Sequence, residues 1–204
     1  HALFQLDGSG VVSPGATFSL TSGTALGTWG FLMIRGGNVR LSDANWRLAT
    51  RLEYGTFAFE GATPNVMGAA SFVATGGDVV WRSTDTLLLF TDSTSVSLQG
   101  ATVSFETRAV FTPTAAFLPT TWLGDVRFYA DSAAATSLTL YGMNVDVTGA
   151  VSIVESATPP TGTAFDLIRL ENGAVLSGSP TMATSGYTLQ VNPAAGVGLR
   201  AVKN

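Results

Sequence analysis

A short pattern returns at nearly constant spacing in this chain of 204 residues: a glycine, then a strand with alternating apolar side chains. In its clearest copy, which begins at Gly149, Val151 and Ile153 share one face of a strand. From Gly77 onward, the glycines that start the copies are 23, 24, 25, 24 and 23 residues apart. They are Gly77, Gly100, Gly124, Gly149, Gly173 and Gly196. Such a period is typical of stacked repeats, in which each unit buries its apolar face against the next.

The repeat predicts an all-β fold, namely a parallel β-helix (β-solenoid) with coils of about 24 residues. Further strand-like segments lie between the copies, such as 138–141 and 165–170, and polar or proline-containing turns separate them. We expect at least four parallel coils between Gly77 and Gly196. The side chains expected to point inward are Val79, Val126, Val151 and Ile153. An antiparallel β-sandwich or jelly roll with evenly spaced strands is the alternative.

The first half of the chain follows the period less well. Gly37 and Gly77 are 40 residues apart, which is not a multiple of 24, and the segment after Gly61 does not continue as a strand. We therefore expect residues 15–204 to form one β-solenoid domain that is irregular before residue 77. Residues 1–14 are expected to form an N-terminal strand and a flexible link, as a cap or as a strand donated to a neighbour.

The segment 46–54 alternates between apolar and polar residues, which predicts a half-exposed strand. Trp46, Leu48 and Leu52 fall on one face, and the charged residues fall on the other. A short helix capped by Ser42 and Asp43 is the alternative for this segment.

Composition excludes several classes of function. Charged residues make up 12% of the chain, about half the usual share, and the net charge is −4. Lys203 is the only lysine, so no basic cluster is present to bind nucleic acid or an anionic membrane surface. No apolar run reaches the roughly 20 residues of a spanning helix. The absence of cysteine excludes disulfides and thiolate metal sites. This composition favours an extracellular protein of the bacterial cell surface, after removal of a signal peptide.

No catalytic, cofactor or metal site is predicted. His1 is the only histidine, so a Ser-His-Asp triad lacks a suitable base and an N-terminal copper site lacks its second ligand. Asp78 and Asp125 both follow a turn glycine, but the matching positions in other copies are not acidic, so we expect these carboxylates to bond backbone amides. The segments 85–86 and 92–94 lack the spaced acids of a calcium loop. Trp29, Trp46, Trp81 and Trp122 could form a sugar-stacking surface. Trp81 is expected in the core, because it takes the place of Leu41, Phe128 and Ile153 in the other copies, and the core is also favoured for Trp46 and Trp122.

The last third of the chain carries a family resemblance. It rests on residues 162–168, Gly173, residues 176–178, residues 186–189 and residues 197–199. These segments resemble the closing part of bacterial autotransporter passenger repeats and related secreted β-strand-repeat proteins. The resemblance implies a surface-exposed parallel β-helix with structural or adhesive roles.

These features predict a non-enzymatic structural protein that assembles head-to-tail with itself into a filament or surface fibre. The expected joint places the N-terminal strand of one chain on an open C-terminal edge of the next. Its residues are Ala2, Phe4 and Leu6 on the strand, and Val197 and Leu199 on the edge. The N-terminal strand folding back on its own first coil is the alternative to donation. A carbohydrate-binding or carbohydrate-active β-helix, with surface glycans as partners, is the alternative function.

Overall fold

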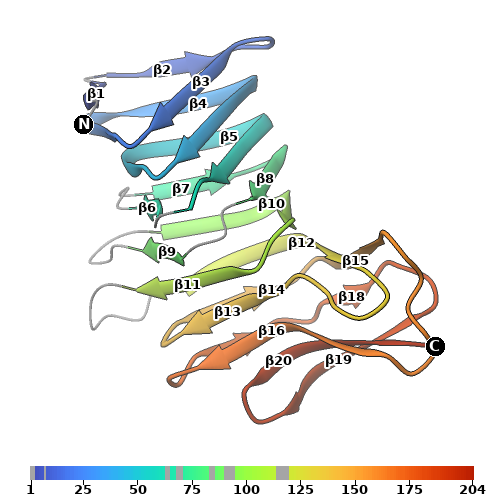
Figure 1. The fold of residues 1–204 in the computed structure, drawn as a ribbon. Helices are drawn as coiled ribbons and strands as arrows, with labels where there is room; N and C mark the ends of the chain where they lie inside the picture. Colours follow the sequence, from blue (N-terminus) through green and yellow to red (C-terminus); the bar gives the residue numbers. More distant parts are fainter. Residues whose placement is uncertain are drawn as a thin grey trace.

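The fold is all-β, and the described residues contain no helix (Figure 1). A computed structural model of the chain describes residues 3–6, 8–62, 65–67, 71–82, 86–89, 95–113 and 120–204. Their strands lie one above another, from the N-terminal end of the molecule to the C-terminal end. The sequence-based prediction of an all-β protein is therefore confirmed.

Parallel pairing arranges the strands in three stacks that the chain visits in turn. Stack 1 contains β1 (Leu3–Gln5), the starts of β4 (Thr24–Ser42) and β5 (Asn45–Glu60), β6 (Asn65–Met67), β9 (Thr86–Leu89), β11 (Ala109–Pro113), β13 (Leu138–Tyr141) and β16 (Ala164–Glu171). We call one passage of the chain through the three stacks a layer. Strands of neighbouring layers are joined by backbone hydrogen bonds, as in any parallel ladder.

The other two stacks are built in the same way. Stack 2 contains β2 (Gly10–Val12), the middles of β4 and β5, β7 (Ser71–Ala74), the starts of β10 (Ser95–Phe105) and β12 (Thr120–Ala130), β14 (Asn144–Val147) and β17 (Val175–Ser177). Stack 3 contains β3 (Thr17–Thr21), the ends of β4, β5, β10 and β12, β8 (Asp78–Trp81), β15 (Ala150–Glu155) and β18 (Thr181–Met182). Long strands such as β4 therefore run through more than one stack.

The C-terminal end breaks the parallel pattern. β19 (Tyr187–Ala194) and β20 (Val197–Lys203) form an antiparallel hairpin. β20 also pairs antiparallel with β16, the last strand of stack 1. These are the antiparallel pairs among the named strands, so the alternative of an antiparallel β-sandwich does not describe the body of the molecule.

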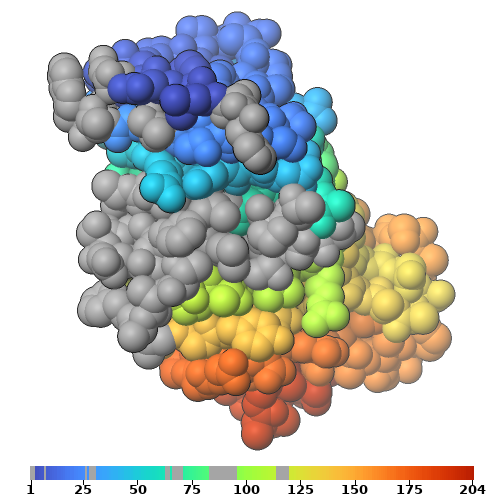
Figure 2. Space-filling model, turned by 60° about the vertical axis from the view of Figure 1, so that its left-hand side comes forward, coloured from blue at the N-terminus to red at the C-terminus, as the bar shows by residue number. Residues whose placement is uncertain are grey.

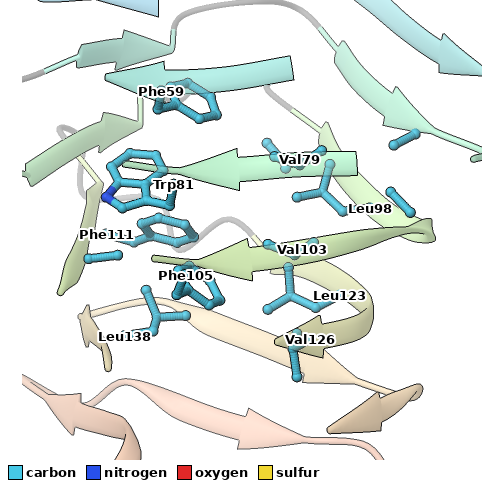
Figure 3. Close-up of a cluster of buried hydrophobic side chains, with 14 of the residues drawn as sticks. Phe59, Val79, Trp81, Leu98, Val103, Phe105, Phe111, Leu123, Val126 and Leu138 are labelled. Carbon is cyan, nitrogen blue, oxygen red and sulfur yellow. The ribbon is translucent and has the colours of Figure 1, made fainter. Parts of the chain in front are cut away.

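The core is a set of apolar columns that run along the stacks. Stack 3 contributes the column Phe18, Val39, Phe57, Val79, Val103, Val126 and Val151, and beside it the column Leu20, Leu41, Phe59, Trp81, Phe105, Phe128 and Ile153. Figure 3 shows Trp81 and Phe105 of the second column beside Phe111. The ring centroids of Phe59 and Trp81 are 4.6 Å apart, and those of Phe105 and Phe128 are 5.2 Å apart. The four side chains predicted to point inward are all buried.

The strands before residue 77 also pair in the three stacks, but β4 and β5 do so with three register shifts, so the expected irregularity affects the register and not the stacking. In stack 3 Val39 pairs with Phe57, and Phe57 pairs with Val79. One further copy lies between those that begin at Gly37 and Gly77, and it begins at Gly55, not at Gly61. A Cβ on Gly55 would overlap the carbonyl oxygen of Gly37, so the two glycines lie against each other in neighbouring layers.

The last two glycines of the predicted period do not continue the column. Val151 pairs with Met182, which is 31 residues further along the chain, because the last layer contains longer turns. Gly173 precedes β17 of stack 2 instead, and Gly196 lies in the turn of the antiparallel hairpin. The period therefore predicts the stacking from Gly77 to Gly149 and fails after it.

The alternating segment 46–54 is a strand, as predicted, and lies within β5. Trp46, Leu48 and Leu52 are fully buried, whereas Arg47 and Arg51 are exposed. The alternative of a helix in this segment is wrong. Gly55 marks the corner at which β5 passes from stack 2 to stack 3.

Substitution of Gly55 tests the close approach of layers. Gly55 and Gly15 both have positive φ angles, 106° and 80°, so alanine at either position adds backbone strain of about 1–3 kcal/mol. Only Gly55→Ala also drives a Cβ into a neighbouring layer, at a further cost of about 1–3 kcal/mol. No atom lies within 4 Å of the Cβ position at Gly15. We expect urea unfolding to show a larger loss of stability for Gly55→Ala than for Gly15→Ala, and equal losses would contradict this packing.

Candidate functional site

The two ends of the molecule differ in how their strand edges are covered. At the N-terminal end, β1, β2 and β3 form the first layer, and each of them pairs with β4 on one side. No strand of the described residues pairs with them on the other side. Among the described strands this layer is therefore paired on one side only, and such an edge is a template for pairing with another strand.

The side chains of this first layer are uncharged and partly apolar. No charged residue occurs between Gly8 and Ile34. Leu3 on β1 is 65% exposed and Val11 on β2 is 55% exposed, the two highest values among the exposed large apolar residues. Charged side chains are the usual protection of an exposed edge, and the described part of this layer has none.

The N-terminal strand lies on its own chain. Phe4 pairs with Ala25 of β4, and its ring packs against Phe18 with centroids 4.8 Å apart. Leu6 is half-buried against the same core. Ala2, also predicted in the joint, lies outside the described residues. In this single chain the strand therefore folds back on its own first layers.

The C-terminal residues predicted to form an open edge are covered. Leu199 is fully buried and Val197 nearly so, because β20 lies between β16 and β19. The expectation that these residues receive a donated strand is corrected by this pairing. Sequence reasoning missed the antiparallel hairpin, although the turn at Ala195-Gly196 between two strand-like segments was a signal for it.

Ion pairs fasten the hairpin to the last layers. Arg200 on β20 bonds Asp166 on β16 at 2.7 Å, and Lys203 bonds Glu155 on β15 at 2.6 Å. The hydroxyl of Tyr187 donates to the same Glu155 oxygen at 2.7 Å, and the Lys203 ammonium lies 4.6 Å from the centre of the Tyr187 ring. The bonds to Asp166 and Glu155 join the hairpin to β16 and β15, and the contact of Lys203 with the Tyr187 ring joins the two strands of the hairpin to each other.

The same contacts shift two pKa values. Hydrogen bonds from Lys203 and Tyr187 hold the pKa of the Glu155 carboxyl below its ordinary value, since they favour the charged form. Burial raises the pKa of the Tyr187 hydroxyl, and its bond to the Glu155 carboxylate adds to the effect. Both shifts describe a structural contact that is stable at neutral pH, because the acid stays charged and the phenol stays protonated.

The acidic residues considered for chemistry do not form an acid–base pair. Asp78 and Asp125 belong to one outward column of stack 3, but Thr102 lies between them in the register, so they are separated by two layer spacings of about 4.8 Å each. Asp125 accepts a hydrogen bond of 2.8 Å from the backbone N–H of Ala150. The carboxylate of Asp146 accepts a bond of 3.0 Å from Ser177. The bonds of Asp125 and Asp146 link neighbouring layers.

Metal and sugar sites gain no support from the described residues. Among them no group of three or more His, Asp or Glu side chains is close enough to hold a metal ion. Asp85 and the segment 92–94 lie outside the described residues. Trp46 and Trp81 are core residues, as predicted. Trp122 is half-buried on the outer face of stack 2, which corrects the expectation of a core position, and the side chain of Trp29 is not among those that the structure describes.

The described surface has two grooves large enough for a small ligand. The first, of about 390 Å³, lies over stack 3. Its lining is Thr17, Asn38, Arg40, Thr56, Ala58 and Arg82. Both arginines contact Glu60, at 2.8 Å and 3.6 Å, and Arg82 also bonds Glu106 at 2.7 Å. The positive charges in this groove are therefore neutralised by a chain of ion pairs between layers.

The second groove, of about 460 Å³, lies where stack 3 turns toward stack 1. Tyr129, Val154 and Arg108 contribute an aromatic ring, an apolar surface and a positive charge to its lining. Of its two acids, Glu155 is held by Lys203, and Asp131 accepts two backbone hydrogen bonds of 2.7 Å in its own loop. Those backbone bonds lower the pKa of Asp131.

Comparison with known proteins identifies no relative. No family model matches the chain, and no curated protein matches it. In the part of the chain that the structure describes, no helix has the length and hydrophobicity needed to cross a membrane. The functional argument therefore rests on the geometry of the ends and grooves.

The ion pair at the C-terminal hairpin predicts a pH dependence of stability. Since the folded-state pKa of Glu155 is depressed, its contribution is fully present above the unfolded-state pKa of about 4.3 and is lost as the pH falls through the lower folded-state value. We expect Glu155→Gln to lower the melting temperature at neutral pH, and the difference from wild type to shrink as the pH falls below about 4.

Glu171→Gln serves as the control for this experiment, because Glu171 is an exposed acid near the end of β16. Its melting temperature should follow the wild type across the same pH range. A Glu155→Gln difference that stays constant with pH would show that the contact with Lys203 contributes no charge-dependent stability.

Proposed function

We propose that the three stacks form a parallel β-solenoid, and that the protein is a non-enzymatic structural protein outside the bacterial cell that associates with copies of itself. The observation that carries the proposal is the open edge of the first layer, formed by β1, β2 and β3. Strand pairing at such an edge supplies main-chain hydrogen bonds without any specialised side chain. The low charge, the single lysine and the absence of cysteine support an extracellular location.

The acidic residues support a structural role over a catalytic one. Hydrolysis of a glycosidic bond uses two facing carboxylic groups, one to donate a proton and one to activate water or attack the sugar. Here Asp125 and Asp146 bond to neighbouring layers, and Glu155 holds the C-terminal hairpin. An acid that supports the fold in this way has a reason to be present without any reaction.

Two measurements test the proposal. We expect sedimentation of the 204-residue chain to show association that increases with protein concentration. We also expect no turnover of acidic or neutral polysaccharides. A chain that stays monomeric at high concentration would rule out self-association. Turnover that is lost in Asp78→Ala or Asp125→Ala would rule out a purely structural role.

Binding of a surface glycan is the second candidate function, and the groove beside Tyr129 favours it. An aromatic ring next to polar groups is a common arrangement for binding a sugar, because the ring stacks on its apolar face. If the groove binds glycans, Tyr129→Ala should weaken binding on a glycan array by about tenfold, a loss of about 1.4 kcal/mol. Tyr54→Ala is the control, because Tyr54 is 51% exposed at a different site. Equal binding by both variants and the wild type would exclude the groove.

A further inference from the structure

We propose that the outer face of stack 2 packs against the same face of a second copy, with the two stacks running in opposite directions around a two-fold axis at the layer of β10. This inference rests on the proposed self-association and names a surface for it other than the edge of the first layer. The contact lies on the side of the molecule, so it does not depend on how either end of the stack is covered.

The outer face of stack 2 carries two columns of outward side chains. Its strands, among them β7, β10, β12 and β14, lie one above another (Figure 1), and the layers follow one another in sequence order along the molecule (Figure 2). Column 1 is Val11, Met33, Arg51, Val73, Ser97, Trp122, Asp146 and Ser177. Column 2 lies beside it and includes Phe31, Ala49, Thr120, Asn144 and Val175. Of these residues only Arg51 and Asp146 are charged.

Trp122 adds a large ring to this face. It is half-buried and lies between Ser97 and Asp146 in the register, so part of its apolar surface faces water. The core of its own chain does not use the ring, because the neighbours Thr121 and Leu123 are the buried residues on the inward side. Tryptophan on an outer face is typical of protein interfaces, where a partner covers the ring.

The two charges of column 1 are not neutralised within the chain. Arg51 lies 3.4 Å from Glu53, but Arg35 binds the same carboxylate more closely, at 2.7 Å. Two arginines therefore share one acid. The carboxylate of Asp146 bonds to the hydroxyl of Ser177 at 3.0 Å, and its oxygen Oδ1 is buried without a hydrogen-bond partner. Among the described residues no cation pairs with Asp146, so the face is positive in one half and negative in the other.

The spacing of these charges defines the two-fold axis. Arg51, Val73, Ser97, Trp122 and Asp146 follow one another in five successive layers, so Ser97 is the midpoint. An axis between the two faces, parallel to the strand of Ser97, keeps the strand direction and reverses the order of the layers. Arg51 of each copy then faces Asp146 of the other, Val73 faces Trp122, and Ser97 faces itself. Each contact thus contains two pairs of opposite charges and two apolar pairs.

Column 2 fits the same axis. Phe31 lies three layers before Ser97, and Val175 lies three layers after it, so they face each other across the contact. Phe31 is 39% exposed and Val175 is 52% exposed, so their contact removes apolar surface of both from water. Sheets pack face to face about 10 Å apart with interdigitated side chains, and the small Ser97 at the axis leaves room for the Trp122 rings on either side.

The charges disfavour the other face-to-face arrangement, in which the axis runs along the stack. That axis brings each layer against the same layer of the second copy. Arg51 would then meet Arg51, and Asp146 would meet Asp146. Like charges that face each other across an interface cost free energy. Opposite stack directions are therefore the arrangement that this face selects.

Exchange of the two charges tests the axis. We expect Arg51→Asp to raise the dissociation constant of self-association, measured by sedimentation, by about tenfold or more, since two acids then meet. Asp146→Arg should do the same, since two arginines then meet. Mixing these two variants, or combining both changes in one chain, should restore association, because an acid again faces an arginine. Failure of both to recover would overturn the contact.

Two further variants control for charge and for folding. Arg127→Asp makes the same change of charge at an outward position of stack 3, so it should associate like the wild type. Asp146→Asn keeps the shape of the side chain and an acceptor for Ser177 but removes the charge. It should raise the dissociation constant by about threefold, and far-UV circular dichroism checks that it is folded.

Cross-linking tests the face independently of charge. The chain contains no cysteine, so Ser97→Cys introduces a single thiol at the axis. A bismaleimide about 10 Å long should link two such copies, because that is the spacing of packed sheets. Ser152→Cys is the control, because Ser152 lies on the outer face of stack 3. Equal cross-linking of the two variants would contradict the contact.

The outcomes separate this inference from the proposed function. A monomeric wild type overturns both self-association and the contact through stack 2. A wild type that associates, with Arg51→Asp and Asp146→Asn associating equally well, overturns the contact through stack 2 and leaves self-association standing.

Discussion

The backbone hydrogen bonds between layers are the interaction on which the rest of this structure depends. Each strand in the body of the molecule pairs with one strand of the preceding layer and one of the following layer. The side chains add apolar columns inside and ion pairs outside, but both follow from a register that the backbone sets. In a structure of this kind the first and last layers each lack one neighbour, so their outer strand edges have no partner strand within the stack.

The two ends of the described chain differ in how these outer strand edges are covered. At the C-terminal end the chain reverses direction, and β20 satisfies the free edge of β16 in antiparallel fashion. Two ion pairs, Arg200 with Asp166 and Lys203 with Glu155, then hold the hairpin in place. The first layer has no comparable device among the described residues, and its segment from Gly8 to Ile34 is free of charge.

The sequence predicts the stacking correctly where successive layers contain nearly the same number of residues. Strands after Gly77, Gly100, Gly124 and Gly149 were placed correctly, because the same two inward positions recur in each of them. Register along a stack depends on which side chains face inward, but layer length depends on the corner turns, which vary freely at the surface. A fixed spacing therefore missed the shorter layer that begins at Gly37 and the longer one that follows Gly149.

The ends were harder to predict than the body, for a related reason. Phe4 and Leu6 alternate as expected of a strand, but alternation is the same for a strand that pairs within its own chain and for one that is donated. Val197 and Leu199 give the same apolar pattern whether β20 runs parallel or antiparallel to β16. The sequence pattern therefore does not distinguish a parallel last coil from an antiparallel hairpin.

Direction matters for assembly, because it decides which surfaces remain open. Parallel coils at both ends would leave two different edges, and different edges join head-to-tail without limit. The reversed hairpin covers the outer edge of β16 in stack 1, whereas β17 and β18 pair on one side only among the described strands. The reversal at the C-terminal end thus gives the two ends different surfaces in stack 1, because a parallel last coil would present a single parallel strand there and the hairpin presents β19.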